Sequence, residues 1–342
     1  MALYDISGNT ISFGSGTVDN SLLYNFTRWN GKILVTEGNS LTKHNNWGDY
    51  LAELLGMSHI NVAKSGSAIT TNPDTGGVTM ADIVANVSDN YPDAVDLVIM
   101  QGDTNVTMDG DPSDQMDGDN PLTTWTARMN YMIRCIKAKY HNVVIVLMPD
   151  SVRYDYTGVE GDPGYTGSRV WETLNINDYN KMKELAEYNR LAFFDFDHAT
   201  PFNPRYADNY YTRTGDPGMS HTIEVHGQDY VHPSVVSYTK SKGYALAQFV
   251  AGLVFDPNAP NTAADGWSEQ YTVTYTLGDG VTSSNTEANF WANVIYQTTL
   301  TGATTVAVTM DGTDITANVY TESSGLVRIP AITGDVVITA TA

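Results

Sequence analysis

Short apolar runs rich in branched residues alternate with segments of helical spacing from Gly31 to about Leu253. Such runs are typical of strands buried on both faces, and their alternation with helices favours a parallel sheet covered on both sides. The expected strands are Lys32–Thr36, Ile60–Ala63, Ala94–Gln101, Val143–Met148 and Leu191–Phe196. The expected helices are Trp47–Leu55, Met80–Ser88, Thr124–Tyr140, Ile176–Asn189 and Ser234–Leu253. The sequence therefore predicts a three-layer α/β/α sandwich with a mainly parallel, flavodoxin-like sheet.

The two ends of the chain differ in character from this α/β part. Residues 1–30 hold two short alternating pieces, and we expect a small β appendage there. Residues 31–255 form the expected α/β domain, and residues 256–268, rich in Pro, Asn, Ala, Asp and Gly, are typical of a linker. Residues 269–342 alternate Val, Thr, Ile and Tyr between turn residues, which predicts a small all-β C-terminal domain.

Charge and composition limit the kinds of binding partner that the sequence predicts. The 342 residues carry a formal net charge of -21, and a surface of this sign repels phosphate backbones, so nucleic acid is not an expected partner. The single cysteine, Cys135, excludes an intrachain disulfide. We expect neither a secretory signal nor membrane insertion, because a basic start and long apolar runs are both missing. Work outside the cell, for example on a virus particle, would need another export route. The oligomeric state stays open.

Ser40 lies in the glycine-containing turn that follows the first expected strand. Open α/β sheets bind their ligands at the carboxyl ends of the strands, so this serine is well placed for chemistry. Serine becomes an effective nucleophile only beside a base that an acid orients. The alternative is a turn serine that caps the following helix, which is the commoner role of an isolated serine.

Asp229 and His232 stand directly before the last expected helix. On a single turn, this spacing lets the carboxylate hold one tautomer of the imidazole, which leaves the other ring nitrogen for a serine. Asp195 and His198 repeat the spacing after the fifth expected strand and form a rival pair. In the alternative interpretation, Asp229 caps the turn and His232 is an ordinary helix-entry residue.

An acyl-transfer site also needs hydrogen-bond donors aimed at the developing oxyanion. Gly66 follows the second expected strand and could bring a backbone N–H close to a substrate, because it has no side chain. Asn105 follows the third expected strand and could offer a side-chain amide. Taken singly, each is more typical of an ordinary turn.

Together these residues resemble the four sequence blocks of the SGNH, or GDSL-type, hydrolase family. The matching segments are Gly38-Asn39-Ser40-Leu41-Thr42, Ser65-Gly66, Gly102-Asp103-Thr104-Asn105 and Asp229-Tyr230-Val231-His232-Pro233. Two positions depart from the family pattern: Asn39 stands where aspartate is usual, and Val106 replaces the acid that commonly follows the asparagine. In this family the acid and histidine directly precede the last helix, which favours Asp229 and His232 over the rival pair.

The resemblance implies a serine esterase that works through an acyl-enzyme. Ser40 would attack the ester carbonyl, His232 would take its proton, and Asp229 would stabilise the imidazolium. The backbone N–H groups of Ser40 and Gly66 and the Asn105 side chain would hold the oxyanion. This mechanism requires no metal or cofactor.

Composition favours a substrate with small acyl groups, chiefly O-acetyl esters on a carbohydrate or polysaccharide. The chain is polar and rich in aromatic residues, carries a β domain, and lacks a long apolar stretch that would line a lipid channel. A lipolytic enzyme or a thioesterase of the same family is one alternative. A second is a carbohydrate-binding protein of a bacteriophage tail or cell surface with an esterase-like domain. The presence of all five catalytic residue types favours the enzyme.

Two further sequence features could bind a ligand: a loop rich in aspartate and a group of three tyrosines. The loop of residues 109–120 gathers many carboxylates, which is plausible for calcium, but it lacks the pattern ending in glutamate that marks a calcium-binding loop. A solvated loop is therefore the favoured interpretation. Tyr206, Tyr210 and Tyr211 could stack on a sugar, although ordinary packing explains them equally well.

Overall fold

The computed structural model describes residues 27–44, 46–66, 79–102, 106–116, 124–150, 155–156, 169–170, 174–199, 211–213, 228–233, 235–256, 258, 261–292 and 294–342. For residues 155–156, 169–170, 174–176, 197–198, 211–213, 228–233 and 235–241 it describes the backbone alone. The predicted N-terminal appendage therefore lies outside the described residues, apart from its last four.

Five parallel strands form the central sheet in the order β2-β1-β3-β4-β7. Their bounds are Ile33–Gly38 for β1, Ser58–Asn61 for β2, Leu97–Gly102 for β3, Val144–Pro149 for β4 and Ala192–Phe193 for β7. This is the flavodoxin-like order, in which the direction of winding reverses between β1 and β3. The predicted fold class is confirmed, and the winding reversal marks the edge of the sheet where such folds bind ligands.

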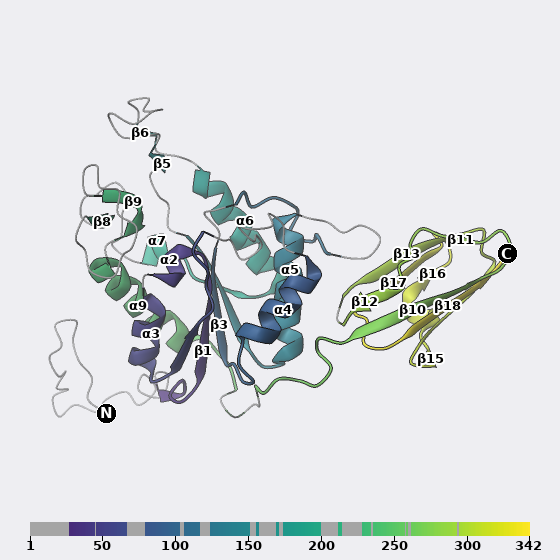
Figure 1. The fold of residues 1–342 in the computed structure, drawn as a ribbon, viewed down its shortest axis with the longest axis horizontal. Helices are drawn as coiled ribbons and strands as arrows, with labels where there is room; N and C mark the ends of the chain where they lie inside the picture. Colours follow the sequence, from purple (N-terminus) through teal and green to yellow (C-terminus); the bar gives the residue numbers. More distant parts are fainter. Residues whose placement is uncertain are drawn as a thin grey trace.

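Helices cover both faces of this sheet (Figure 1): α4, α5 and α6 on one side, and α3 and α9 on the other. The helices are α2 (Ser40–Lys43), α3 (Trp47–Leu55), α4 (Met80–Asn90), α5 (Trp125–Lys139), α6 (Leu174–Asn189), α7 (Phe196–Ala199) and α9 (Val235–Gly252). Among the described residues, none of the helices is both long enough and apolar enough to span a bilayer.

Successive residues of the inner strands enter two different cores. Leu97 and Ile99 of β3 join the core that contains Trp47 of α3. Val98, between them, joins the core that contains Ile133 of α5. All five side chains are almost completely buried. A strand with no solvent face needs apolar residues at every position, which explains the continuous runs in the sequence.

The outer strands depart most from the predicted bounds. β2 starts at Ser58 and ends at Asn61, earlier than the predicted Ile60–Ala63. It is an edge strand, where partly exposed polar side chains are tolerated, so the apolar pattern does not mark its start. At the other edge, β7 is shorter than the predicted Leu191–Phe196, and Phe196 instead begins α7.

The residues just before β1 are fastened to the end of α9. Trp29 is fully buried, donates its indole N–H to the Val250 carbonyl at 3.0 Å, and stacks on Phe255 with ring centroids 4.0 Å apart. Arg28 donates to the Ala251 carbonyl at 2.8 Å. These contacts join the first and last described elements of the α/β domain.

The C-terminal part is a small all-β unit of two sheets, with strand orders β12-β10-β18-β14-β15 and β11-β13-β17-β16. In β18, buried Val336, Ile338 and Ala340 alternate with exposed residues, so one face of the strand is apolar. Figure 1 places this unit beside the α4–α5 side of the α/β domain. The elements are β10 (Gln270–Leu277), β11 (Thr282–Ser283), β12 (Asn289–Trp291), β13 (Tyr296–Thr301), β14 (Thr305–Met310), β15 (Thr313–Asp314), α10 (Thr316–Val319), β16 (Tyr320–Thr321), β17 (Leu326–Ile329) and β18 (Val336–Thr341).

The later part of the segment between the two parts is attached to the α/β domain. The Ala263 N–H donates to the Asp93 carbonyl at 2.7 Å, and the Ala264 N–H donates to the Lys139 carbonyl at 2.8 Å. The Lys139 ammonium lies 5.3 Å from the centroid of the Trp267 ring. Part of the stretch predicted as a linker therefore has fixed contacts before β10 begins.

Candidate active site

Ser40 is the first residue of α2, at the carboxyl end of β1. The residue before it, Asn39, is the N-cap, and its side-chain oxygen accepts the Leu41 N–H at 2.8 Å. The alternative, in which Ser40 caps the following helix, is wrong, because Asn39 is the N-cap of α2 and Asn46 is the N-cap of α3 (Trp47–Leu55), the helix expected from the sequence. Ser40 is partly exposed, whereas Asn39 is fully buried. The serine thus stands at the surface of a turn that is anchored from below.

Gly38 lets this turn approach β3 closely. Its φ is +154°, and a Cβ at this position would lie 2.4 Å from both the Gln101 carbonyl oxygen and Thr42 Oγ1. A side chain would force one of these groups to move, so only glycine fits. Gly38 is also in register with Gln101 across the β1–β3 pair. The close approach sets Ser40 beside the end of β3, at the point where the winding of the sheet reverses.

A buried polar network lies beneath the serine turn. Asp150, directly after β4, accepts hydrogen bonds from Asn39 Nδ2 at 2.7 Å and from Gln101 Nε2 at 2.6 Å. Gln101 Oε1 in turn accepts from Thr42 Oγ1 at 2.9 Å and from Trp47 Nε1 at 3.1 Å. The network joins the ends of β1, β3 and β4 to the starts of α2 and α3. Asp150 and Gln101 were not predicted from the sequence, because no local pattern marks residues that meet only across strands.

Gly66 lies beyond the end of β2, on the same edge of the sheet as Ser40. Its φ is +74°, a left-handed conformation that glycine adopts readily, and a Cβ there would meet no described atom within 4 Å. The Lys64 N–H donates to the Gly38 carbonyl at 3.0 Å, which ties the two turns together. His44 Nε2 and Ser65 Oγ, 2.5 Å apart, join them a second time. Ser40 and Gly66 therefore belong to neighbouring, connected turns.

The remaining predicted site residues are only partly described. Asp229 and His232 lie in β9 (Gln228–Pro233), which pairs with β8 (Tyr211–Arg213), and α9 follows directly. Their backbone is a strand rather than the single turn expected from the sequence, and their side chains lie outside the described residues. Asn105 also lies outside the described residues, as do Tyr206 and Tyr210. The roles predicted for the three catalytic residues stay predictions.

The rival pair, Asp195 and His198, lies around the start of α7. The Asp195 carboxylate accepts a hydrogen bond from the Tyr179 hydroxyl at 2.5 Å. Only the backbone of His198 is described. The acid of this pair thus has a contact with α6 that fixes its carboxylate.

One hydroxyl–imidazole–carboxylate chain occurs elsewhere, on the outer part of the sheet. Thr36 Oγ1 lies 2.8 Å from His59 Nε2, and His59 Nδ1 lies 2.6 Å from Asp49 Oδ1. A Cβ on Gly48 would lie 2.5 Å from the imidazole, so this glycine leaves room for it. Thr36 is completely buried, which keeps a substrate away from its hydroxyl. These hydrogen-bonded side chains connect α3 and β2 to β1 and do not form a second active site.

A buried carboxyl group precedes the serine turn on the opposite face of the sheet. Glu37 accepts hydrogen bonds from Asn86 Nδ2 and from the Tyr91 hydroxyl, both at 3.2 Å. Burial raises the pKa of Glu37 to about 7, although these hydrogen bonds and the charge of Lys64 oppose the shift. Glu37 therefore changes charge near neutral pH, on the side covered by α4.

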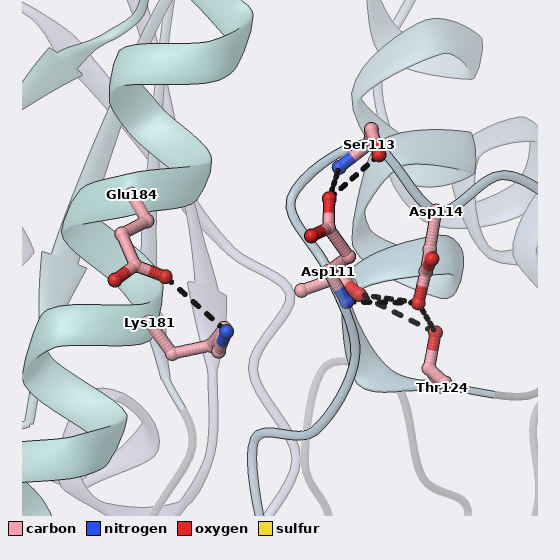
Figure 2. A network of polar contacts seen from close by, with 7 residues as sticks. Asp111, Ser113, Asp114, Thr124, Lys181 and Glu184 are labelled. Carbon is pink, nitrogen blue, oxygen red and sulfur yellow. Dashed lines mark hydrogen bonds and ion pairs between the residues drawn. The ribbon is translucent and has the colours of Figure 1, made fainter.

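The described carboxylates of the aspartate-rich loop bind the chain's own donors (Figure 2). Asp111 accepts from the Ser113 N–H and hydroxyl, and Asp114 accepts from the Asp111 N–H and the Thr124 hydroxyl. Asp109 accepts from the Trp125 N–H at 2.7 Å, at the start of α5. Within the described part of the chain, no group of three or more His, Cys, Asp or Glu side chains is arranged to hold a metal ion. These contacts favour a structural role at the start of α5.

A parallel α/β sheet with a serine turn at its winding reversal is the arrangement expected of an SGNH-type hydrolase. The sequence model of the GDSL-like lipase/acylhydrolase family matches residues 35–240, more than half of the chain. The chain therefore belongs to this family and is a hydrolase that acts on esters.

Solved structures of similar fold were also found. An aryl esterase from M. smegmatis is 16% identical with a TM-score of 0.42, and a carbohydrate acetylesterase from Sinorhizobium meliloti is 15% identical with a TM-score of 0.42; each match covers 66% of this chain and 100% of the other. A possible lipase from Chitinophaga pinensis is 17% identical with a TM-score of 0.41, covering 64% and 96%. These likenesses are too distant to carry an argument about substrate. A comparison with curated protein sequences gave no match.

Proposed function

We propose that this protein is a serine esterase that removes small acyl groups, chiefly O-acetyl, from a carbohydrate or polysaccharide. The observation that carries the proposal is the position of Ser40. It is partly exposed at the carboxyl end of β1, on a turn that Gly38 and the Asn39 cap hold against the neighbouring strands. Hydrolases place a nucleophile in this way, on a rigid turn open to substrate.

In the proposed reaction, Ser40 Oγ attacks the ester carbonyl while His232 removes its proton. Asp229 stabilises the imidazolium that forms. The N–H groups of Ser40 and Gly66, together with the Asn105 amide, hold the negative oxygen of the tetrahedral intermediate. The intermediate collapses as the alcohol leaves with the proton from His232. Water, activated by the same imidazole, then attacks the acyl-enzyme and releases the acid.

The small acyl group and the carbohydrate follow from the composition of the chain. It is polar, with 11% aromatic residues, and its described helices include none of the length and apolarity that a membrane helix has. A polar chain that is rich in aromatic residues suits sugar rings better than long acyl chains. We therefore expect acetate to be the acid that is released fastest, and a polymer to be the natural substrate.

The first experiment compares hydrolysis of p-nitrophenyl acetate with that of longer acyl esters. We expect the acetate to react much faster, and Ser40→Ala to lower its rate by a factor of about a thousand or more. Ser88→Ala, which changes an exposed serine of α4, is the matched control and should keep the wild-type rate. Equal rates for wild type and Ser40→Ala would remove the esterase proposal.

The second experiment identifies the substrate. Acetylated polysaccharides are incubated with the wild-type protein, and released acetate is measured. Release that Ser40→Ala abolishes supports the carbohydrate assignment. A preference for long acyl esters would instead indicate a lipolytic enzyme, and a preference for thioesters would indicate a thioesterase.

A further inference from the structure

One buried carboxylate holds two amide side chains below the serine turn. Asp150 Oδ2 lies 2.7 Å from Asn39 Nδ2, and Asp150 Oδ1 lies 2.6 Å from Gln101 Nε2. Asp150 is 5% exposed, and Asn39 and Gln101 are 0% exposed. Both of these contacts come from neutral amides, each at the short distance typical of charge-assisted hydrogen bonds. A carboxylate so deeply buried is costly unless hydrogen bonds satisfy it, and these two amides supply such bonds.

The carboxylate determines which way each amide points. An amide has a donor end and an acceptor end, whereas an ionised carboxylate only accepts. Facing Asp150, Asn39 must turn its NH₂ group inward, which directs its oxygen to the Leu41 N–H at 2.8 Å. Gln101 must do the same, which directs its oxygen to Thr42 Oγ1 at 2.9 Å. One side chain thereby orients two contacts that hold α2.

These two contacts fix the segment that contains Ser40. Asn39 and Leu41 flank the serine, and Thr42 follows within the same short helix. The Thr42 and Lys43 N–H groups bond to the Asn39 carbonyl at 3.1 and 2.9 Å, so a shift of Asn39 would move the whole turn. Asp150 is itself anchored, because its N–H donates to the Gly102 carbonyl of β3 at 2.9 Å.

We propose that Asp150 is a positioning residue for the Ser40 nucleophile, acting through Asn39 and Gln101. The inference rests on the esterase function proposed above. The aspartate that the family usually carries at position 39 is here an asparagine, and the carboxylate of the pair stands across the hydrogen bond, on Asp150. The pair in this chain therefore consists of an amide at position 39 and a carboxylate at position 150.

An exchange of the two side chains tests this directly. In Asn39→Asp/Asp150→Asn, the carboxylate now at position 39 can accept from the Leu41 N–H and from the new amide at position 150. That amide can still accept from Gln101 with its oxygen. Each hydrogen bond of the pair is then restored, with donor and acceptor exchanged between the two positions. Each single change breaks the match. Asn39→Asp sets two carboxylates against each other, and Asp150→Asn leaves one acceptor oxygen for the two NH₂ groups of Asn39 and Gln101, so one of them faces another NH₂ group.

We expect each single variant to lower kcat for p-nitrophenyl acetate by about ten- to a hundredfold with little change in KM, as for a misplaced nucleophile. Asn39→Asp should lose kcat further as pH rises, because two adjacent carboxylates must share a proton to stay in contact. The double exchange should recover kcat to within about threefold of wild type. If the pair served only the stability of the fold, the exchange would restore thermal stability without restoring kcat. Should Asp150→Asn not fold, the pH profile of Asn39→Asp at low and high pH still decides the matter.

A nearby acid provides an internal check on charge at position 150. Burial raises the pKa of Asp178, the hydrogen bond from the Met108 N–H lowers it, and the charge of Asp150, the smallest of the three causes, raises it. Removing the charge in Asp150→Asn should lower the pKa of Asp178, and an NMR titration of that carboxyl follows it. The Asp178 change reports that the variant has lost the buried charge while kcat reports the effect on Ser40.

The series separates this inference from the function on which it rests. Wild type and Ser40→Ala are assayed alongside the variants. If Ser40→Ala keeps the wild-type rate, the proposed function fails and the positioning role fails with it. If Ser40→Ala is inactive but the single variants keep kcat, or the double exchange regains thermal stability without kcat, the function stands and the positioning role is overturned.

Discussion

The α/β sheet and the C-terminal β unit use alternation along a strand in different ways. In β3 of the α/β sheet, neighbours such as Val98 and Ile99 enter separate cores, so no face meets solvent. In β18 of the β unit, buried Ile338 and exposed Thr339 follow one another, so one face is apolar and the other polar. In the first sheet, buried polar side chains such as Thr36 and Gln101 find their hydrogen-bond partners inside the domain, whereas the second sheet spreads its polar groups over its surface.

The two regions also use polar side chains differently: the α/β domain buries them below the candidate site, and the β unit places them on its surface between strands. In the β unit, polar pairs such as Thr305 and Thr341, with hydroxyls 2.5 Å apart, are exposed and link neighbouring strands. In the α/β domain, Asn39, Gln101 and Asp150 are buried together at strand ends, below Ser40. Buried polar groups are expensive and must be paired, and this paired group lies at the edge of the sheet that carries Ser40.

The largest expected effect tests which histidine of the α/β domain is the base for Ser40. His232→Ala should lower the rate of p-nitrophenyl acetate hydrolysis by a factor of about a thousand, because the serine loses its base. His198→Ala, the matched control from the rival pair, should keep most of the rate. A loss for His198→Ala equal to that for His232→Ala would show that the wrong pair was chosen.

A smaller loss is expected when the orienting acid is removed. Asp229→Asn should cost about ten- to a hundredfold less than His232→Ala, since the imidazole can still act as a base when it is less well held. Stopped-flow measurement of the acylation step at several pH values checks this. A loss as large as that of His232→Ala would give Asp229 a more direct role than orientation.

The next expected effect is on the stability of the folded protein rather than on the rate, and it depends on a buried acid of the α/β domain. The pKa of Glu37 is about 7 when folded, above the ordinary 4.5, so the folded state holds a proton that the unfolded state has lost. Stability should therefore fall as pH rises from about 4.5, by about 3 kcal/mol once pH exceeds about 7. Glu37→Gln should abolish that fall, as urea unfolding at about pH 5 and about pH 8 would show.

Asp82 provides the control of opposite sign. Hydrogen bonds from the Thr79 N–H and hydroxyl lower the pKa of Asp82, so its contribution is present at neutral pH and lost as pH falls. Asp82→Asn should leave the change between neutral and alkaline pH as it is in wild type. If Glu37→Gln shows the wild-type fall on the alkaline side, the carboxyl responsible lies elsewhere.

The smallest expected effect concerns the β unit. A chain ending after Trp267 keeps the hydrogen bonds of Ala263 and Ala264 to the α/β domain, so it should hydrolyse p-nitrophenyl acetate at the wild-type rate. A chain ending after Asp256 loses these contacts and should melt at a lower temperature. If the chain ending after Trp267 loses activity on a polymer but keeps it on the small ester, the β unit is a binding module. If that chain also loses activity on the small ester, the β unit is needed for catalysis, which would contradict a catalytic site built from the α/β domain alone.

The sequence pattern predicted most of the elements that hold the site. α3 matches the predicted Trp47–Leu55, because its apolar spacing and local signals agree. α2 was not predicted, since a helix of four residues depends on the Asn39 cap and on contacts across strands rather than on periodicity. β9 was not predicted either, because the spacing of Asp229 and His232 also fits a single turn.

The candidate nucleophile was predictable, but its support was not. Ser40 and Gly66 follow strands that the apolar runs reveal, so their shared edge follows from parallel topology. Asp150 comes directly after β4, yet nothing in its neighbourhood announces that it meets Asn39. That meeting depends on the register of three strands, which a single sequence does not contain.

The central claim is that the Ser40 hydroxyl, at the end of β1, is the nucleophile. Treating the wild-type protein with a fluorophosphonate and mapping the adduct by mass spectrometry tests it most directly, because such reagents trap an activated serine covalently. The account predicts one adduct, on Ser40, with loss of ester hydrolysis in step with labelling and no adduct in Ser40→Ala. An adduct on a different residue that tracks the loss of activity would contradict it.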